Sequence, residues 1–109
     1  MKGLPVSRPA AGVIRIISAW AAATGHRILL TDVRSVDWQA LTFSGERHRI
    51  TLVLEGPSPE LAARELVTFL PEAEFFVAGH IVADIAATLG GQDETSSVSV
   101  AIEALTIVE

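Results

Sequence analysis

Residues 44–70 read SGERHRITLVLEGPSPELAARELVTFL, and this stretch decides the fold. Its first part alternates between apolar and polar residues, which is typical of a strand that buries one face. The apolar positions are Ile50, Leu52 and Leu54. A strand over residues 47–55 is therefore predicted, and the Gly-Pro-Ser-Pro sequence that follows ends it.

The segment after this boundary has the signature of a helix. Ser58 is a suitable N-cap, and Pro59 fits the first helical position, where its missing N–H costs nothing. One apolar stripe then recurs at helical spacing, formed by Ala62, Ala63, Leu66, Val67, Phe69 and Leu70. The pattern predicts a helix over residues 58–70 that ends at Pro71.

Upstream of residue 47, short apolar and alternating runs predict more strands. Residues 37–44 alternate, and a turn at 44–46 joins them to the next strand as a β-hairpin. The apolar run 26–32 follows a glycine and predicts a separate short strand. Residues 33–36 are expected to connect that strand to the hairpin.

The N-terminal part predicts a first helix over residues 9–24. Pro9 suits its first turn, apolar residues recur at helical spacing, and Gly25 is suited to end it in the left-handed conformation. The β-branched residues within 13–17 leave a strand as the alternative.

The C-terminal part predicts a long hairpin. Residues 74–88 are interpreted as a strand, with a helix over 79–89 as the alternative, and residues 90–96 as a polar turn. The last strand, 97–108, changes its apolar side near Leu105, which indicates either a bulge or apolar residues on both faces.

Together these elements predict one α+β domain over residues 1–109 in the order α-β-β-β-α-β-β. Two helices would cover one face of an antiparallel-rich sheet, and a ferredoxin-like architecture is consistent with that arrangement. No internal repeat is visible in the sequence.

The hydrophobic content exceeds what one covered sheet face requires. Half of the 109 residues are hydrophobic, only 19% are charged, and mean hydropathy is +0.44. Because two helices cover only one face, the second face needs another cover, and a second copy of the chain is the simplest one. The sequence therefore predicts a homodimer, with a monomer whose own loop covers the face as the alternative.

Charge divides the chain into two parts. All eight Lys and Arg residues lie in 1–64, which has net charge +3, whereas 65–109 has net charge −8. The acidic total of −5 argues against a nucleic-acid partner, because phosphate binding needs clustered bases. The chain has no cysteine and no apolar run as long as a membrane span. We expect a cytoplasmic protein with no membrane partner.

His80 and Asp84 form the first candidate site. In a helix they would be i,i+4 neighbours, and Asp84 could orient a basic His80 as general acid and base. In a strand they would share a face about 13 Å apart. The competing interpretation is an imidazole bonded to a backbone carbonyl and an aspartate at a sheet edge or interface.

A second candidate site binds an anion or a partner. Arg47 and Arg49 suit a phosphate or carboxylate, because guanidinium groups bind both through a planar fork. Their alternative is a solvated hairpin edge. Trp38 is the best candidate for a partner contact, since aromatic residues dominate interface energetics. No metal or cofactor is expected, because the three histidines lack metal-ligand spacing.

The leading functional hypothesis is a small non-enzymatic module that self-associates through its sheet. It would act as an interaction or regulatory subunit or bind a small ligand at the dimer seam. The alternative is a small enzyme that uses His80 and Asp84 as acid and base in a pocket between sheet and helix.

Overall fold

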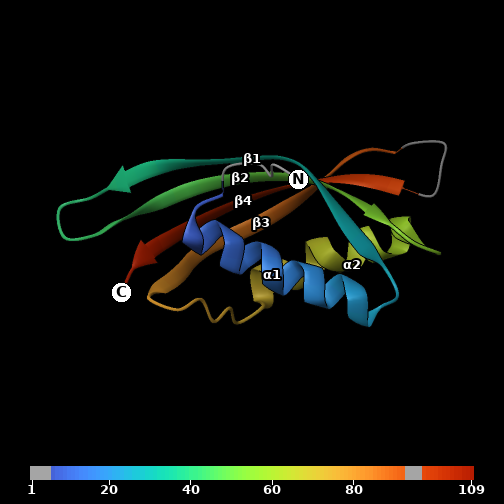
Figure 1. Ribbon diagram of the computed structural model, residues 1–109, viewed down its shortest axis with the longest axis horizontal. Coiled ribbons are helices and arrows are strands. Elements are labelled where there is room, and N and C mark those ends of the chain that lie inside the picture. The colour runs from blue at the N-terminus through green and yellow to red at the C-terminus, as the bar shows by residue number, and fades with distance from the viewer. Residues whose placement is uncertain (1–5, 93–96) are drawn as a thin grey trace.

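A computed structural model describes residues 6–92 and 97–109 and shows an α+β fold of two helices and one four-stranded sheet. The elements are α1 (Arg8–Ala23), β1 (Arg27–Gln39), β2 (Ser44–Glu55), α2 (Pro59–Glu72), β3 (His80–Gln92) and β4 (Ser97–Val108). The sheet order is β1-β2-β4-β3, and each neighbouring pair is antiparallel. Both helices pack on one face of the sheet (Figure 1), which confirms the predicted fold class.

The observed order α-β-β-α-β-β consists of one αββ unit repeated. The two units meet at the centre of the sheet, where Ile50 of β2 lies opposite Ile102 of β4. Each helix has a serine N-cap, Ser7 or Ser58, and a proline in its first turn. This structural repeat has no counterpart in the hydrophobic pattern. The ferredoxin-like order, β-α-β-β-α-β, is obtained only by moving the last strand to the front, so that relationship stays a prediction.

The predicted short strand, connector and first hairpin strand are one strand, β1. The register of β1 against β2 shifts between Leu30 and Asp32, so Thr31 lies in a β-bulge and its hydroxyl donates a hydrogen bond to the carbonyl of Thr51 at 3.1 Å. A bulge changes which residues face the core. The alternation therefore breaks at this point, and the sequence wrongly indicated a separate strand.

The turn of the first hairpin lies before the predicted position. The backbone N–H of Ala40 donates to the carbonyl of Phe43 at 2.9 Å, and Ser44 already belongs to β2. Ser44, Gly45 and Glu46, predicted as the turn, are paired with residues 37–39 of β1.

In the C-terminal hairpin, residues 80–88 form a strand as predicted, and the helical alternative for 79–89 is wrong. Residues 90–92, predicted as part of the turn, also belong to β3. The strand begins later than predicted, because residues 74–79 form a connection in which the Phe76 side chain is 89% exposed. Buried residues alternate along β4 without a break, so this strand contains no bulge. The change of apolar side near Leu105 therefore reflects apolar residues on both faces of the strand. Residues 93–96 of the predicted turn lie outside the described residues.

The core lies between the helices and one face of the sheet. Ile17 of α1 and Leu66 of α2 are fully buried against the alternate residues of β2 and β4. The rings of Trp20 and Phe69 stack with their centroids 5.8 Å apart, which joins the two helices. Helix α2 continues through Pro71 to Glu72, two residues beyond its predicted end.

The opposite face of the sheet carries neither helix (Figure 1). We call it the open face, and its residues are those that alternate with the buried positions and line up through the strand register. They include Leu29, Arg34, Val36 and Trp38 of β1; Arg47, Arg49, Thr51 and Val53 of β2; Ala101, Glu103, Leu105 and Ile107 of β4; and Ile81, Asp84, Ala86 and Thr88 of β3.

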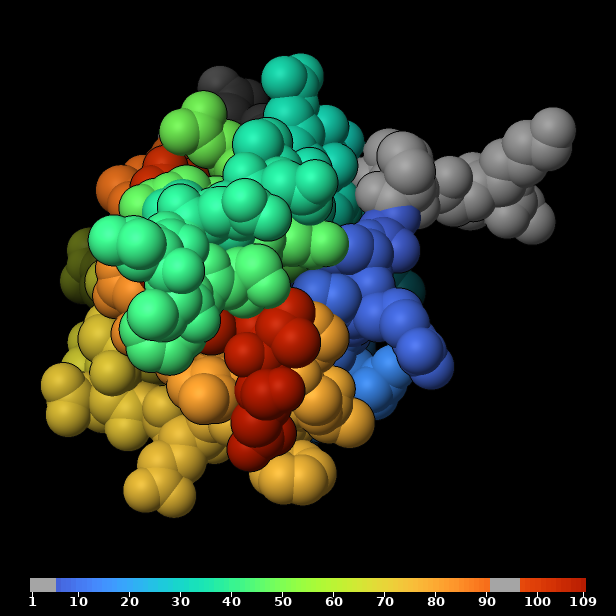
Figure 2. All heavy atoms as spheres, turned by 90° about the vertical axis from the view of Figure 1, so that its left-hand side faces the viewer, coloured from blue at the N-terminus to red at the C-terminus, as the bar shows by residue number. Residues whose placement is uncertain are grey.

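The β1–β2 hairpin extends beyond the N-terminal end of α1 (Figure 1). Figure 2 faces this end of the molecule and shows the green hairpin residues beside the red end of β4 and the orange start of β3. The hairpin tip carries Leu41, which is fully exposed, and Phe43, which is 55% exposed.

Candidate functional site

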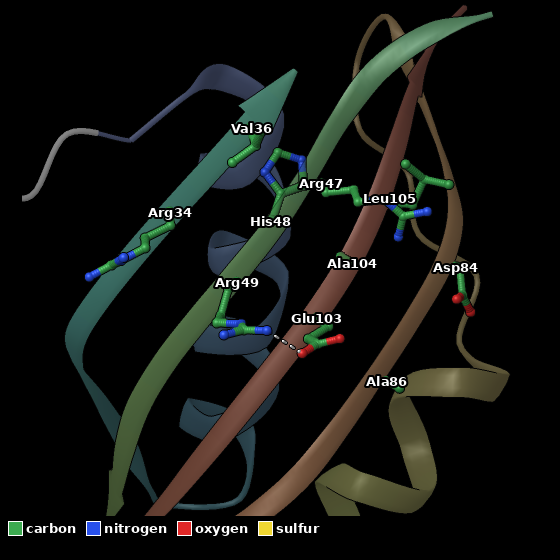
Figure 3. A pocket seen from close by; sticks show the side chains of 10 residues that line it. All are labelled: Arg34, Val36, Arg47, His48, Arg49, Asp84, Ala86, Glu103, Ala104 and Leu105. Atoms are coloured by element: carbon green, nitrogen blue, oxygen red, sulfur yellow. Dashed lines mark hydrogen bonds and ion pairs between the residues drawn. The ribbon is translucent and has the colours of Figure 1, made fainter. Parts of the chain in front are cut away.

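A hollow of about 450 Å³ lies in the open face, and all four strands contribute to it (Figure 3). Its lining residues are Arg34, Val36, Arg47, His48, Arg49, Asp84, Ala86, Glu103, Ala104 and Leu105. The hollow therefore collects the predicted anion contacts, Arg47 and Arg49, together with Asp84 of the predicted acid–base pair.

The basic and the acidic side chains of the hollow come from different strands. Arg47 lies opposite Leu105, and Leu105 lies opposite Asp84. One row further along, Arg49 lies opposite Arg34 on one side and opposite Glu103 on the other. The arginines thus come from β1 and β2 and the acids from β3 and β4, as Figure 3 shows.

Arg47 differs from the other two arginines of the hollow in its contacts. Arg49 pairs with Glu103 and Arg34 pairs with Asp32, both at 3.1 Å. Among the residues that the structure describes, Arg47 has no such ion pair, and its guanidinium carbon lies 6.0 Å from the centroid of the Trp38 ring. That distance allows a cation–π contact. The fold therefore brings together the predicted binding residues Arg47, Arg49 and Trp38 on one face.

His80 and Asp84 do not come together. Within β3 the register shifts between Val82 and Asp84, so His80 pairs with Val108 whereas Asp84 pairs with Leu105. Val108 and Leu105 point to opposite faces of β4, because they are separated by an odd number of positions. The side chains of His80 and Asp84 therefore also lie on opposite faces of the sheet. The expectation that a strand would place them on one face is wrong, because a bulge at residue 83 intervenes.

Asp84 and His80 line two separate hollows. Asp84 is exposed in the open-face hollow. His80 lines a separate hollow of about 470 Å³ beside Arg8 and Arg15 of α1. Its Nδ1 atom donates a hydrogen bond to the carbonyl of Ala78 at 3.2 Å, which matches the competing interpretation of an imidazole bonded to the backbone.

A polar cluster around His48, in which His48 and Thr106 are buried, was not predicted from the sequence. The Nδ1 atom of His48 is 2.7 Å from the hydroxyl of Ser35, and its Nε2 atom is 2.7 Å from the hydroxyl of Thr106. Ser35 in turn accepts from Ser7, the N-cap of α1, at 3.4 Å. The signal was present in the strand period, since residue 48 is in phase with buried Ile50, but the neighbouring arginines suggested a surface position.

Burial controls the protonation of His48. The side chain is fully buried, and loss of solvation lowers the pKa of its imidazole. Glu46, whose carboxylate oxygen lies 3.8 Å from Nδ1, opposes this shift, and His80 adds to it. That Glu46 oxygen is buried and has no hydrogen-bond partner in the described chain. Burial therefore favours the neutral form of His48, and its ring joins β1, β2 and β4.

His26 also has a structural role. The backbone N–H of Ser58 donates to its Nε2 atom at 3.2 Å, so the ring proton lies on Nδ1 and is donated to the hydroxyl of Thr24 at 3.1 Å. The ring lies against Gly56, where any side chain would collide with it. His26 thus connects the end of α1 to the start of α2.

No group of three or more His, Cys, Asp and Glu side chains is arranged to hold a metal ion within residues 6–92 and 97–109. Within the same ranges, neither helix has the length and apolarity to cross a membrane.

The strongest candidate for a functional surface is therefore the open face, with its charged hollow and its uncovered apolar side chains. Comparison with known proteins found no matching family model, no matching curated protein and no matching solved structure.

Proposed function

We propose that this protein is a small non-enzymatic module that forms a homodimer through the open face of its sheet and acts as an interaction or regulatory subunit. The observation that carries the proposal is that both helices pack on one face, while the other face bears apolar side chains on all four strands.

The apolar side chains of the open face lie at its centre as well as at its edges. Val53, Leu105 and Ile107 belong to the two central strands and are only partly covered by their neighbours. At the edges, Val36 of β1 is 65% exposed and Ile81 of β3 is 51% exposed. Burial of apolar surface stabilises an association by about 25 cal/mol per Å² before the costs of binding are subtracted.

A second copy of the chain offers a surface of the same kind as a cover for this face. Two sheets pack face to face at about 10 Å through interlocking side chains, and the open face supplies such a layer on each copy. A two-fold dimer uses the same patch on both subunits, so no further partner is required.

A small anion is the ligand that such a dimer could hold at its seam. The observation in favour is Arg47, which in the described part of the chain has a tryptophan contact but no carboxylate partner. Arg fits carboxylate and phosphate groups equally well, so the ligand class is a small anion of either kind.

The alternative function, a small enzyme, needs His80 and Asp84 in one pocket. They lie on opposite faces of the sheet and line separate hollows. No geometric observation supports acid–base catalysis by this pair, and we prefer the non-enzymatic function.

Replacing Leu105 by glutamine tests the proposal without changing any charge. The amide tolerates water in a monomer but costs about 1–3 kcal/mol when buried without a partner. We therefore expect the dimer dissociation constant, measured by sedimentation equilibrium, to rise about tenfold or more in Leu105→Gln.

Leu61→Gln is the matched control, because Leu61 is 59% exposed and belongs to α2, which packs on the other face of the sheet. It should leave the dissociation constant unchanged. If Leu105→Gln keeps the wild-type circular dichroism and also the wild-type dissociation constant, the open face is not the interface.

A further inference from the structure

The open face is divided into a basic half and an acidic half. On β1 and β2, Arg27 pairs with Glu55 and Arg34 pairs with Asp32, which leaves Arg47 and Arg49 as the excess positive charge of that half. Arg49 also pairs with Glu103 across the boundary between the two halves. On β3 and β4 the same face carries Asp84 and Glu103. No Lys or Arg occurs after residue 64, so nothing on those two strands offsets the acids.

Two copies can stack their open faces around a two-fold axis in two principal ways. An axis parallel to the strands reverses the strand order across the seam and places β1 over the partner's β3 and β2 over the partner's β4. An axis across the strands keeps the order and places β1 and β2 over the same two strands of the partner. The first arrangement sets basic against acidic halves, and the second sets like against like.

We infer that the dimer forms around the axis parallel to the strands, so that Arg47 and Arg49 of each copy face the acidic half of the other. This inference rests on the proposed self-association and specifies its geometry. Like charges brought together at an interface are strongly unfavourable, and complementary charges fix the orientation of the partners.

A charge-swapped variant distinguishes the two axes. Arg47→Glu, Arg49→Glu, Asp84→Arg and Glu103→Arg together exchange the two halves and keep the net charge at −5. All four side chains are exposed, and the Arg49–Glu103 ion pair is rebuilt with its signs reversed. The variant should therefore fold as the wild type does.

With the axis parallel to the strands, the swapped variant pairs with itself as the wild type does, because its halves are still complementary. A mixed pair would set acid against acid and base against base. We expect native mass spectrometry of an equilibrated mixture, with one protein ¹⁵N-labelled, to show both homodimers and mixed dimers about tenfold below the statistical share.

The axis across the strands predicts the reverse. The wild type and the swapped variant would then pair preferentially with each other. Mixed dimers at or above the statistical share would overturn the inferred axis and leave self-association intact. Wild-type protein that stays monomeric in the same experiment would overturn the proposed function and the axis together.

Discussion

His48 shows how one polar residue can be buried in the sheet at low cost. Both ring nitrogens lie 2.7 Å from hydroxyl groups, those of Ser35 and Thr106, so neither nitrogen is left unpaired. An unpaired buried polar group would cost about 1–3 kcal/mol. The two hydroxyls belong to the strands on either side of β2, and the imidazole therefore holds three strands in register.

The lowered pKa of His48 predicts a pH-dependent stability. Between that lowered pKa and about 6.5, the ordinary histidine value, the unfolded chain binds more protons than the folded one. The stabilisation is therefore complete above pH 6.5 and is lost as the pH falls toward the folded-state pKa. Glu46 limits the effect, and His80 increases it.

His48→Gln removes this titration and keeps a group that can bond both hydroxyls. We expect the difference in unfolding free energy between wild type and His48→Gln, from urea titrations at constant protein concentration, to shrink as the pH is lowered below 6.5. Other titrations are common to both proteins and cancel. A difference that stays constant between about pH 7.5 and pH 5 would contradict the assigned pKa shift.

The relation of His80 to Asp84 could not be predicted from the sequence. Counting residues places positions 80 and 84 on the same face of a strand, and one bulged residue between them reverses that result. Bulges depend on the local pairing with the neighbouring strand and leave no fixed sequence signal. A prediction that two residues of one strand share a face therefore holds only where no bulge lies between them.

At the scale of elements, the apolar stripe of α2 is the prediction that the structure supports in most detail. Ala62, Ala63, Leu66 and Leu70 are all buried. Proline and serine determined the start of the helix, because their effects on backbone conformation are local. Local signals of this kind can be recognised in one sequence without knowledge of the fold.

Leu66→Ala should lower the unfolding free energy by about 2–5 kcal/mol, because Leu66 is fully buried and the substitution leaves a cavity. Urea denaturation measures the loss. Leu61→Ala in the same helix removes the same atoms from a side chain that is 59% exposed, and it should cost well under half as much. Equal losses in the two variants would show that α2 packs on the sheet through a different face.

The strand pairing was less predictable than the helices. The bulge at Thr31 broke the alternation of β1 and made one strand resemble two elements. The order of strands in the sheet also depends on contacts between residues far apart in the chain, such as Ile50 with Ile102. Those contacts follow from the packing of both αββ units and cannot be derived from either unit alone.

At the scale of the whole molecule, composition predicted the uncovered apolar face correctly. A chain that is half hydrophobic and has only two helices carries more apolar surface than one covered sheet face can bury. The charge division of the sequence has a structural counterpart on the same face. On that face the first strand pair carries an excess of basic residues, and the second pair, beside it in the sheet, carries Asp84 and Glu103.

The position of the charged hollow was only partly predictable. Arg47 and Arg49 alternate with buried residues, so the sequence placed them on the outer face of their strand. Their approach to Glu103 and Asp84 depends on β4 lying between β2 and β3, which the sequence does not indicate. The polar cluster of His48 was missed for the same reason, since Thr106 reaches it across 58 residues.

The most direct test of the central claim is the mass of the wild-type protein in solution. Light scattering at about 50 μM, a concentration at which a dimer of micromolar affinity is populated, should give a value near twice 11.6 kDa. A mass of 11.6 kDa at that concentration would show that the open face stays in water and would contradict the account.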